Sequence, residues 1–310
     1  MGVYEEVEFK TVDGINLRGR LYAAQNRGPG VVMGPGLNIT MEMSGIPNTA
    51  EAFQSAGITA LVYDHRGVGA SDGSPRNNIN PFVQMDDMSD AITFLSSRAS
   101  VDPKAGVGLW GLSLGGSVAM VTAALDPRVR FVVAVAPITE IAHNMTKLRP
   151  MLAKAAKDRE SQVKGNEPFY VPMLNKKGEN PAGFNPGFDQ ETVKRLLDAY
   201  DELDPLQVSL APNHLNRTTV GTYRYMLLWD MDHMWKYIVQ PVLFLLPRKD
   251  QILSVETQMA HYNKLGGPKQ LHIQEDAGHM DILDGPHSER VNDVQSDFIR
   301  NALDNQIPKY

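Results

Sequence analysis

The 310-residue sequence has 42% hydrophobic and 21% charged residues, which is typical of a globular protein with one large domain or a domain with an insertion. Its formal net charge of -6 argues against a nucleic-acid-binding surface, and the lack of cysteine excludes disulfides, thiolate nucleophiles and cysteine metal sites. The acidic start lacks the apolar core of a signal peptide and no apolar run approaches membrane-spanning length, so we expect a cytoplasmic protein that binds no membrane.

The first half of the chain alternates between predicted strands and predicted helices. Residues 5–10 and 14–22 form a hairpin, further strands follow at 30–33, 58–63 and 131–136, and helical patterns cover 49–56 and 82–95. Because the later strands are almost continuously apolar, they indicate a mostly parallel sheet covered by helices on both faces.

The alternation stops between residues 139 and 237, where no convincing strand is found. One amphipathic helix is marked there by Val193, Leu196, Leu197 and Tyr200. The sheet pattern resumes at residues 241–246 and 270–274, and a closing helix is expected over 289–303. We therefore predict a core formed by residues 1–138 and 238–310, with a mostly helical lid, residues 139–237, inserted between two strands of the sheet.

A Gly-x-Ser-x-Gly turn, Gly111 to Gly115, connects an apolar strand to an Ala-rich helix. The glycines allow strand and helix to approach closely, and the turn would lift the Ser113 hydroxyl above the sheet toward the free N–H groups of the helix. In this context the motif predicts a serine nucleophile.

A serine nucleophile needs a base and an acid at the same edge of the sheet. Asp250 follows one late strand and His279 follows the next, so the chain order is Ser113, Asp250, His279. This order matches a Ser-His-Asp triad on a parallel sheet. Asp276 and Asp281 are alternatives for the acid, but neither is placed at a strand end.

The oxyanion of an acyl-transfer intermediate would need two backbone donors. We expect the N–H of Leu114, directly after the nucleophile, and the N–H of Leu37, in the loop after the strand at 30–33. Many enzymes with this arrangement carry His-Gly in that loop, whereas this chain has Pro35-Gly36.

Three other groups of residues could carry chemistry. Residues 64–71 read as a structural turn, with Arg66 paired inside the fold and His65 as a satisfied loop histidine. Residues 230–233 contain two aspartates and a histidine, but adjacent helical positions diverge, so no metal is expected. Adaptable aromatic and methionine side chains of the lid are expected to line an apolar substrate pocket: Tyr223, Met226, Trp229, Met234 and Trp235.

Over nearly its whole length the chain resembles the α/β-hydrolase superfamily, in particular the dienelactone-hydrolase-like and X-Pro-dipeptidyl-peptidase-like branch. Within it the chain is similar to fungal polyketide transferases and thiohydrolases. The segments that carry the resemblance are 36–38, 64–71, 108–116, Lys249-Asp250 and Gly278-His279. The resemblance implies an α/β-hydrolase fold and acyl chemistry on a polyketide or another hydrophobic ester or thioester.

The leading hypothesis is a hydrolase or acyltransferase that forms an ester on Ser113 and needs no cofactor. The acyl substrate would be presented free or by a carrier protein or polyketide synthase, and a homodimer is compatible with the sequence. An alternative keeps the pocket but uses His279 as a simple acid or base for condensation, cyclisation or elimination. A non-enzymatic binding protein is a third hypothesis, disfavoured because all three catalytic positions are present.

Overall fold

The computed structural model describes residues 2–185, 187–188 and 190–308. Its centre is an eight-stranded sheet with the strand order β1-β2-β4-β3-β5-β6-β9-β10. The first two strands form an antiparallel hairpin at one edge, β2 pairs antiparallel with β4, and all further pairs are parallel. The strands are β1 (Glu5–Lys10), β2 (Asn16–Tyr22), β3 (Gly30–Gly34), β4 (Thr59–Tyr63), β5 (Val107–Leu112), β6 (Val129–Val135), β9 (Val242–Pro247) and β10 (Lys269–Gln274).

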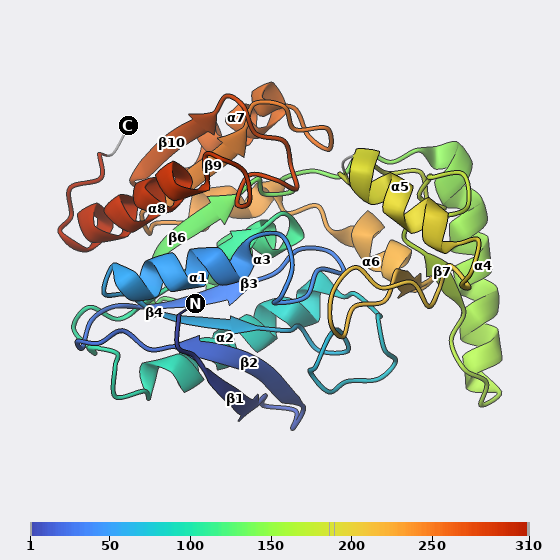
Figure 1. The fold of residues 1–310 in the computed structure, drawn as a ribbon, viewed down its shortest axis with the longest axis horizontal. Coiled ribbons are helices and arrows are strands. Elements are labelled where there is room, and N and C mark those ends of the chain that lie inside the picture. The colour runs from blue at the N-terminus through green and yellow to red at the C-terminus, as the bar shows by residue number, and fades with distance from the viewer. Residues whose placement is uncertain (1, 186, 189, 309–310) are drawn as a thin grey trace.

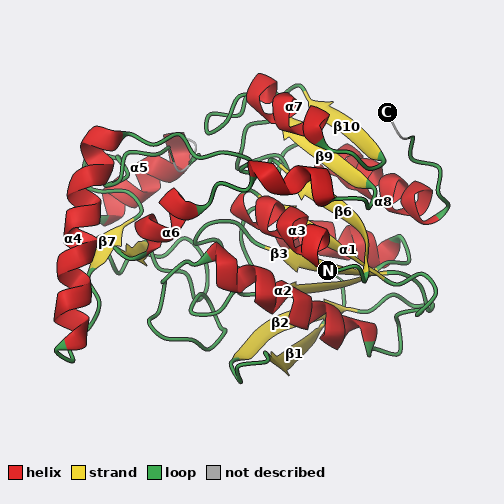
Figure 2. Cartoon of the chain, turned by 180° about the vertical axis from the view of Figure 1, so that it is seen from behind, coloured by secondary structure: helices red, strands yellow, loops and turns green. Residues whose placement is uncertain are grey.

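Helices cover both faces of this sheet, and each face has its own apolar core. One face carries α1 (Ile46–Ser55) and α8 (Ser288–Leu303), which lie in front of the strands in Figure 1. The other carries α2 (Pro81–Ser96), α3 (Leu114–Leu125) and α7 (Val255–Lys264), which are in front in Figure 2. Strands β3, β4 and β5 are buried along their whole length, which explains their continuous apolar sequences.

Between β6 and β9 the chain leaves the sheet and forms an additional body, here called the insert (residues 139–237). Helix α4 and its neighbours lie beyond one end of the sheet, at the right of Figure 1. At the end of the insert η1 packs against α3 and α7, which brings the chain back onto the core. The insert contains α4 (Met145–Val163), β7 (Tyr170–Pro172), α5 (Gln190–Ala199), β8 (Arg217–Thr219), α6 (Thr222–Leu228) and the 3-10 helix η1 (Asp232–Tyr237).

The prediction that residues 139–237 contain no strand is wrong. Strands β7 and β8 pair antiparallel, with Tyr170 opposite Thr219 and Pro172 opposite Arg217. Each strand has only three residues, which is too short for an alternating pattern to be recognised in the sequence. The pair is reinforced by the Arg217 guanidinium, which lies 4.6 Å from the centre of the Tyr170 ring.

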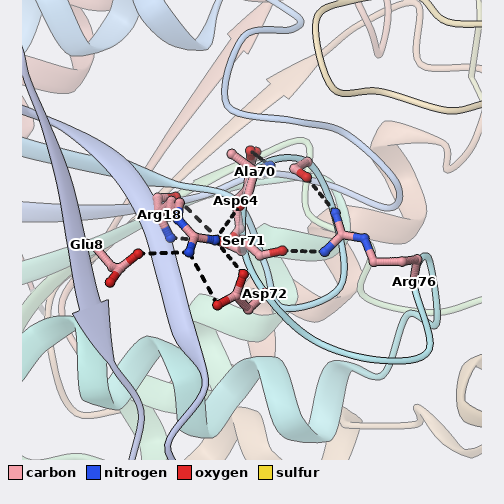
Figure 3. A network of polar contacts seen from close by, with 8 residues as sticks. Glu8, Arg18, Asp64, Ala70, Ser71, Asp72 and Arg76 are labelled. Carbon is pink, nitrogen blue, oxygen red and sulfur yellow. Dashed lines mark hydrogen bonds and ion pairs between the residues drawn. The ribbon is translucent and has the colours of Figure 1, made fainter.

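The segment after β4 forms a dense polar turn (Figure 3). The buried Asp64 carboxylate accepts the backbone N–H groups of Met41 at 2.7 Å and Ala70 at 2.8 Å. Arg18 donates to Asp72 and to the carbonyl of Ala70. Burial raises the pKa of Asp64 to about 6, despite these two backbone hydrogen bonds. The turn therefore joins the hairpin, β4 and the loop after β3 into one rigid unit.

Arg66 in the same turn is paired, as the sequence suggested. Its guanidinium contacts Asp87 of α2, whose side chain is fully buried, and Asp13 of the first hairpin, whose side chain is 58% exposed. One arginine therefore fastens α2 to the edge of the sheet.

Within the described part of the chain, no helix is both long and apolar enough to cross a membrane.

The two carboxylates on Arg66 allow a controlled test of this contact. Asp87→Ala should lower the free energy of unfolding by about 2 kcal/mol, because it leaves a partly buried guanidinium without its buried partner. Asp13→Ala removes the exposed partner and should cost less than about 1 kcal/mol. Urea unfolding of both variants measures the difference, and equal losses would contradict this account of the pair.

Candidate active site

The connection between β5 and α3 holds Ser113 in an unusual backbone conformation, with φ 57° and ψ -122°. The neighbouring backbone is too close for larger residues. A Cβ on Gly111 would lie 2.1 Å from the Gly115 carbonyl oxygen, and a Cβ on Gly115 would lie 2.2 Å from the Gly34 carbonyl oxygen. The glycines of the motif are therefore explained by close approach, both across the turn and to the loop after β3.

Ser113, His279 and Asp250 are brought into one chain of hydrogen bonds. The Ser113 Oγ lies 2.9 Å from His279 Nε2, and His279 Nδ1 lies 2.9 Å from Asp250 Oδ2. The side chains of His279 and Asp250 are 1% and 0% exposed. Because a carboxylate only accepts, Nδ1 carries the proton and Nε2 is free to accept the Ser113 hydroxyl.

The carboxylate of Asp250 is itself oriented by three further donors. Its Oδ1 accepts the backbone N–H groups of Ile252 at 2.8 Å and Leu253 at 3.2 Å, and Gln258 donates to Oδ2 at 3.3 Å. These contacts fix Asp250 at the end of β9, where it faces His279.

The two other aspartates considered for the acid have different partners. Asp276 accepts a hydrogen bond from Gln274, and Asp281 accepts the backbone N–H of Gly278 at 2.6 Å. Asp281 thus shapes the loop that carries His279 without touching the imidazole.

Two backbone N–H groups are available next to Ser113. Leu37 and Leu114 line the same cavity as Ser113, and neither N–H donates a hydrogen bond within residues 2–185, 187–188 and 190–308. The loop that carries Leu37 is held by His65, whose Nε2–H donates to the Pro35 carbonyl at 3.0 Å. His65 lies in the core, so it supports this loop from behind and does not reach the cavity.

The cavity above Ser113 is bounded by both the core and the insert, and most of its lining is apolar. The core contributes Leu37, Ile39, Met43, Ile138, Ile252 and Met280. The insert contributes Ile141, Ala142, Met173, Phe184, Phe188 and Met226. The polar lining residues are Asn38, Ser113, Glu140, Asn185 and His214.

The insert also covers the histidine. The Asn185 side chain donates to the Gln251 carbonyl at 3.0 Å, in the loop that carries Asp250. A Cβ on Gly187 would lie 3.2 Å from the Cδ2 atom of His279. The Gly187 backbone therefore lies close to the His279 ring, whose side chain is 1% exposed.

Of the five insert residues predicted to line the pocket, Met226 lines the cavity that contains Ser113. Tyr223 lines a smaller neighbouring cavity together with Met226 and Phe184. The Tyr223 hydroxyl accepts from Thr218 at 3.2 Å inside the insert, and the Trp229 indole donates to Ser117 of α3 at 3.1 Å. Met234 and Trp235 pack on the core cluster that α3 contributes to. The prediction is therefore corrected for Trp229, Met234 and Trp235, because large side chains at the end of the insert fill its junction with the core, whereas Tyr223 packs in the insert's own apolar cluster.

The cavity residues that sequence reasoning missed lie mostly in irregular segments. Phe184, Phe188 and His214 belong to loops of the insert, where no periodic pattern assigns a side chain to a face. The high apolar content of the insert was the sequence signal for the two phenylalanines, and His214 had none.

The Asp230–His233 segment is used for packing and ion pairing. Asp232 accepts hydrogen bonds from Lys264 at 2.7 Å and from His261 at 2.8 Å, both on α7. Among the residues that the structure describes, no group of three or more His, Asp or Glu side chains is arranged to hold a metal ion.

The family model described as "Serine aminopeptidase, S33" matches residues 31–285. The chain belongs to this family of α/β hydrolases. A thiohydrolase of Eupenicillium brefeldianum is 40% identical over 96% of this chain and 94% of its own length. A polyketide transferase of Penicillium crustosum is 37% identical over 97% of this chain and 98% of its own length.

Solved structures agree with the fold of this hydrolase. The α/β hydrolase GrgF from Penicillium sp. sh18 superposes with a TM-score of 0.84 and 35% identity, over 97% of this chain and 99% of GrgF. The predicted fold class is therefore confirmed, and the chain is an enzyme of the α/β-hydrolase type.

The buried His65 of this hydrolase gives a prediction for its pH stability. Burial lowers the pKa of His65 from 6.5 to about 4, so the unfolded chain binds the proton more tightly. The stability that a neutral His65 contributes is present above pH 6.5 and is lost as pH falls toward 4, by about 3 kcal/mol. His65→Gln keeps a donor for Pro35 and should flatten the decline of unfolding free energy between pH 7 and pH 4. Urea unfolding of both proteins at several pH values measures this decline. The same decline in wild type and His65→Gln would contradict its assignment to His65.

Proposed function

We propose that this hydrolase cleaves a hydrophobic, polyketide-derived acyl thioester or ester through a covalent Ser113 intermediate, and passes the acyl group to water or an alcohol. The observation that carries the proposal is the hydrogen-bond chain from Asp250 through His279 to Ser113, at the base of a mostly apolar cavity. In the first step His279 removes the hydroxyl proton while Ser113 Oγ bonds to the acyl carbon. Asp250 holds the Nδ1–H tautomer and stabilises the imidazolium.

Collapse of the tetrahedral intermediate breaks the bond to the leaving sulfur or oxygen. The leaving group takes the proton from His279 Nε2, which restores the neutral imidazole. The negative oxygen of the intermediate is stabilised by the free N–H groups of Leu37 and Leu114, whose presence beside Ser113 supports this role. In the second step His279 deprotonates the acceptor, whose oxygen bonds to the acyl carbon. The ester bond to Ser113 then breaks, and Ser113 Oγ takes the proton back from His279.

The choice between hydrolysis and transfer depends on which acceptor reaches the ester. The His279 side chain is 1% exposed and lies close to Gly187 of the insert, and a site with little access to water favours a bound alcohol over bulk water. The names of the similar fungal proteins, thiohydrolase and polyketide transferase, support both outcomes and support a polyketide chain as the acyl group.

Removing the nucleophile tests the covalent mechanism. Ser113→Ala should lower kcat on an acyl thioester at least about 10³-fold, since base and acid have no group left to activate. A fluorophosphonate probe should label the wild-type enzyme on Ser113 and leave the variant unlabelled. Retention of most activity by Ser113→Ala would instead support acid–base chemistry by His279 without an acyl-enzyme.

Two of the aspartates near His279, Asp250 and Asp276, provide a matched test of the acid. Asp250→Asn should lower kcat by about 10³- to 10⁴-fold, because an amide can hold the wrong imidazole tautomer. Asp276→Asn is the control: its carboxylate lies on the surface side of the loop and pairs with Gln274, so kcat should stay within about threefold. A large loss in Asp276→Asn with a small one in Asp250→Asn would overturn the assignment.

A further inference from the structure

Two polar side chains meet at the wall of the mostly apolar cavity, one from the core and one from the insert. Asn38 follows Leu37 in the loop after β3, and His214 lies in a loop of the insert before β8. They are 3% and 4% exposed, and Asn38 Nδ2 lies 3.4 Å from His214 Nε2. No step of the proposed mechanism uses either side chain.

The orientation of the Asn38 amide is fixed by groups that can only donate or only accept. Arg217 Nε donates to Asn77 Oδ1 at 3.3 Å, so the Asn77 amide nitrogen faces Asn38 and donates to its Oδ1 at 3.1 Å. At the other end Asn38 Nδ2 donates to the Leu215 carbonyl at 2.9 Å. Both ends require Asn38 to present its NH₂ group toward His214.

The tautomer of His214 is fixed in the same way. Its Nδ1 lies 3.1 Å from the backbone N of Leu210, which can only donate, so Nδ1 accepts and Nε2 carries the hydrogen. Burial lowers the pKa of His214 to about 4, which keeps the ring neutral with a single N–H near neutral pH.

The contact between Asn38 and His214 is therefore an approach of two donors, which cannot bond to each other. One Nδ2 hydrogen is used on Leu215, and neither the second nor the Nε2–H has an acceptor within residues 2–185, 187–188 and 190–308. A buried donor without an acceptor is costly, by about 1–3 kcal/mol. Two such donors facing one cavity indicate that a ligand atom accepts from both.

We propose that Asn38 and His214 form a two-donor site that binds a ketone oxygen on the acyl chain of the substrate. A ketone oxygen has two lone pairs and no hydrogen, so it can accept from both N–H groups at once. A hydroxyl carries a hydrogen of its own, for which neither of these two donor groups offers an acceptor. The inference rests on the proposed function, and it narrows the acyl group of the substrate to an oxo-acyl chain.

Binding of non-hydrolysable thioethers tests the site independently of turnover. In these probes a methylene replaces the thioester carbonyl of an N-acetylcysteamine derivative, and chains of equal length carry either no ketone or one ketone at successive carbons. At one ketone position the wild-type enzyme should bind the oxo-thioether about tenfold more tightly than the alkyl thioether by calorimetry. No preference at any position would overturn the proposal.

Two substitutions of His214 separate recognition from loop structure. His214→Asn retains an acceptor for the Leu210 N–H but does not reach the Nε2 position, so the preference for the ketone should fall to within about twofold of unity. His214→Gln extends an N–H to that position and should keep most of the preference. Ser209→Ala, in the same loop with an exposed side chain, is the control that should bind as wild type does.

The outcomes separate this proposal from the proposed function. Equal weakening of oxo- and alkyl-thioether binding in His214→Asn, with melting temperature retained, would show a general structural role and overturn the site. Failure of the wild-type enzyme to cleave alkanoyl or oxoalkanoyl thioesters would overturn the proposed function, while the binding preference would still decide whether the two donors recognise a ketone.

Discussion

Ser113 is held at a positive φ between a buried strand and a buried helix, in a conformation that costs about 1–3 kcal/mol for a residue with a side chain. Packing of the surrounding strand and helix offsets this cost. Strand β5 lies at the centre of the sheet, α3 is buried over most of its length, and the glycines at 111 and 115 let the backbone segments touch. The hydroxyl is thereby aimed at the carboxyl edge of the sheet, and every other element of the site is placed relative to it.

The loop after β3 must also adopt a defined position, because its backbone approaches the start of α3 with no side chain between them. Its position is secured from behind by the segment after β4. His65 binds the Pro35 carbonyl, and Asp64 binds the N–H of Met41 a few residues further on. The polar turn at residues 64–71 therefore supports Leu37 and Asn38 while remaining outside the cavity. Its role is structural, because it holds in place the loop that carries Leu37 and Asn38.

The insert adds a second wall to the cavity at the open edge of the sheet. Its C-terminal end packs on the core through large side chains, such as Trp229 against Ser117 and Trp235 against His261. Its loops then reach over the site from the far side, where Asn185 contacts the loop of Asp250 and His214 meets Asn38. The cavity thus has its catalytic residues at the edge of the sheet and much of its lining in the loops of the insert.

These two parts also differ in how far the sequence predicts them. Strands such as β5 and β9 are predicted well, because short continuous apolar runs bounded by turn residues are typical of buried strands. The order of Ser113, Asp250 and His279 then follows from where such strands end. The lining could not be predicted, since Phe184 and His214 lie in loops without periodicity. The aromatic residues of the insert were assigned to the pocket because aromatic side chains often line apolar pockets. Tyr223 and Trp235 are instead buried in the interior.

The central claim is that an acyl group becomes attached to Ser113 during turnover. The most direct test mixes the intact enzyme with an oxoalkanoyl thioester, quenches within the first turnovers and measures the protein mass. The account predicts a mass increase equal to the acyl group, located on the peptide that contains Ser113, and its absence in Ser113→Ala. Rapid thioester consumption by an enzyme that never gains this mass, with the same rate in Ser113→Ala, would contradict it.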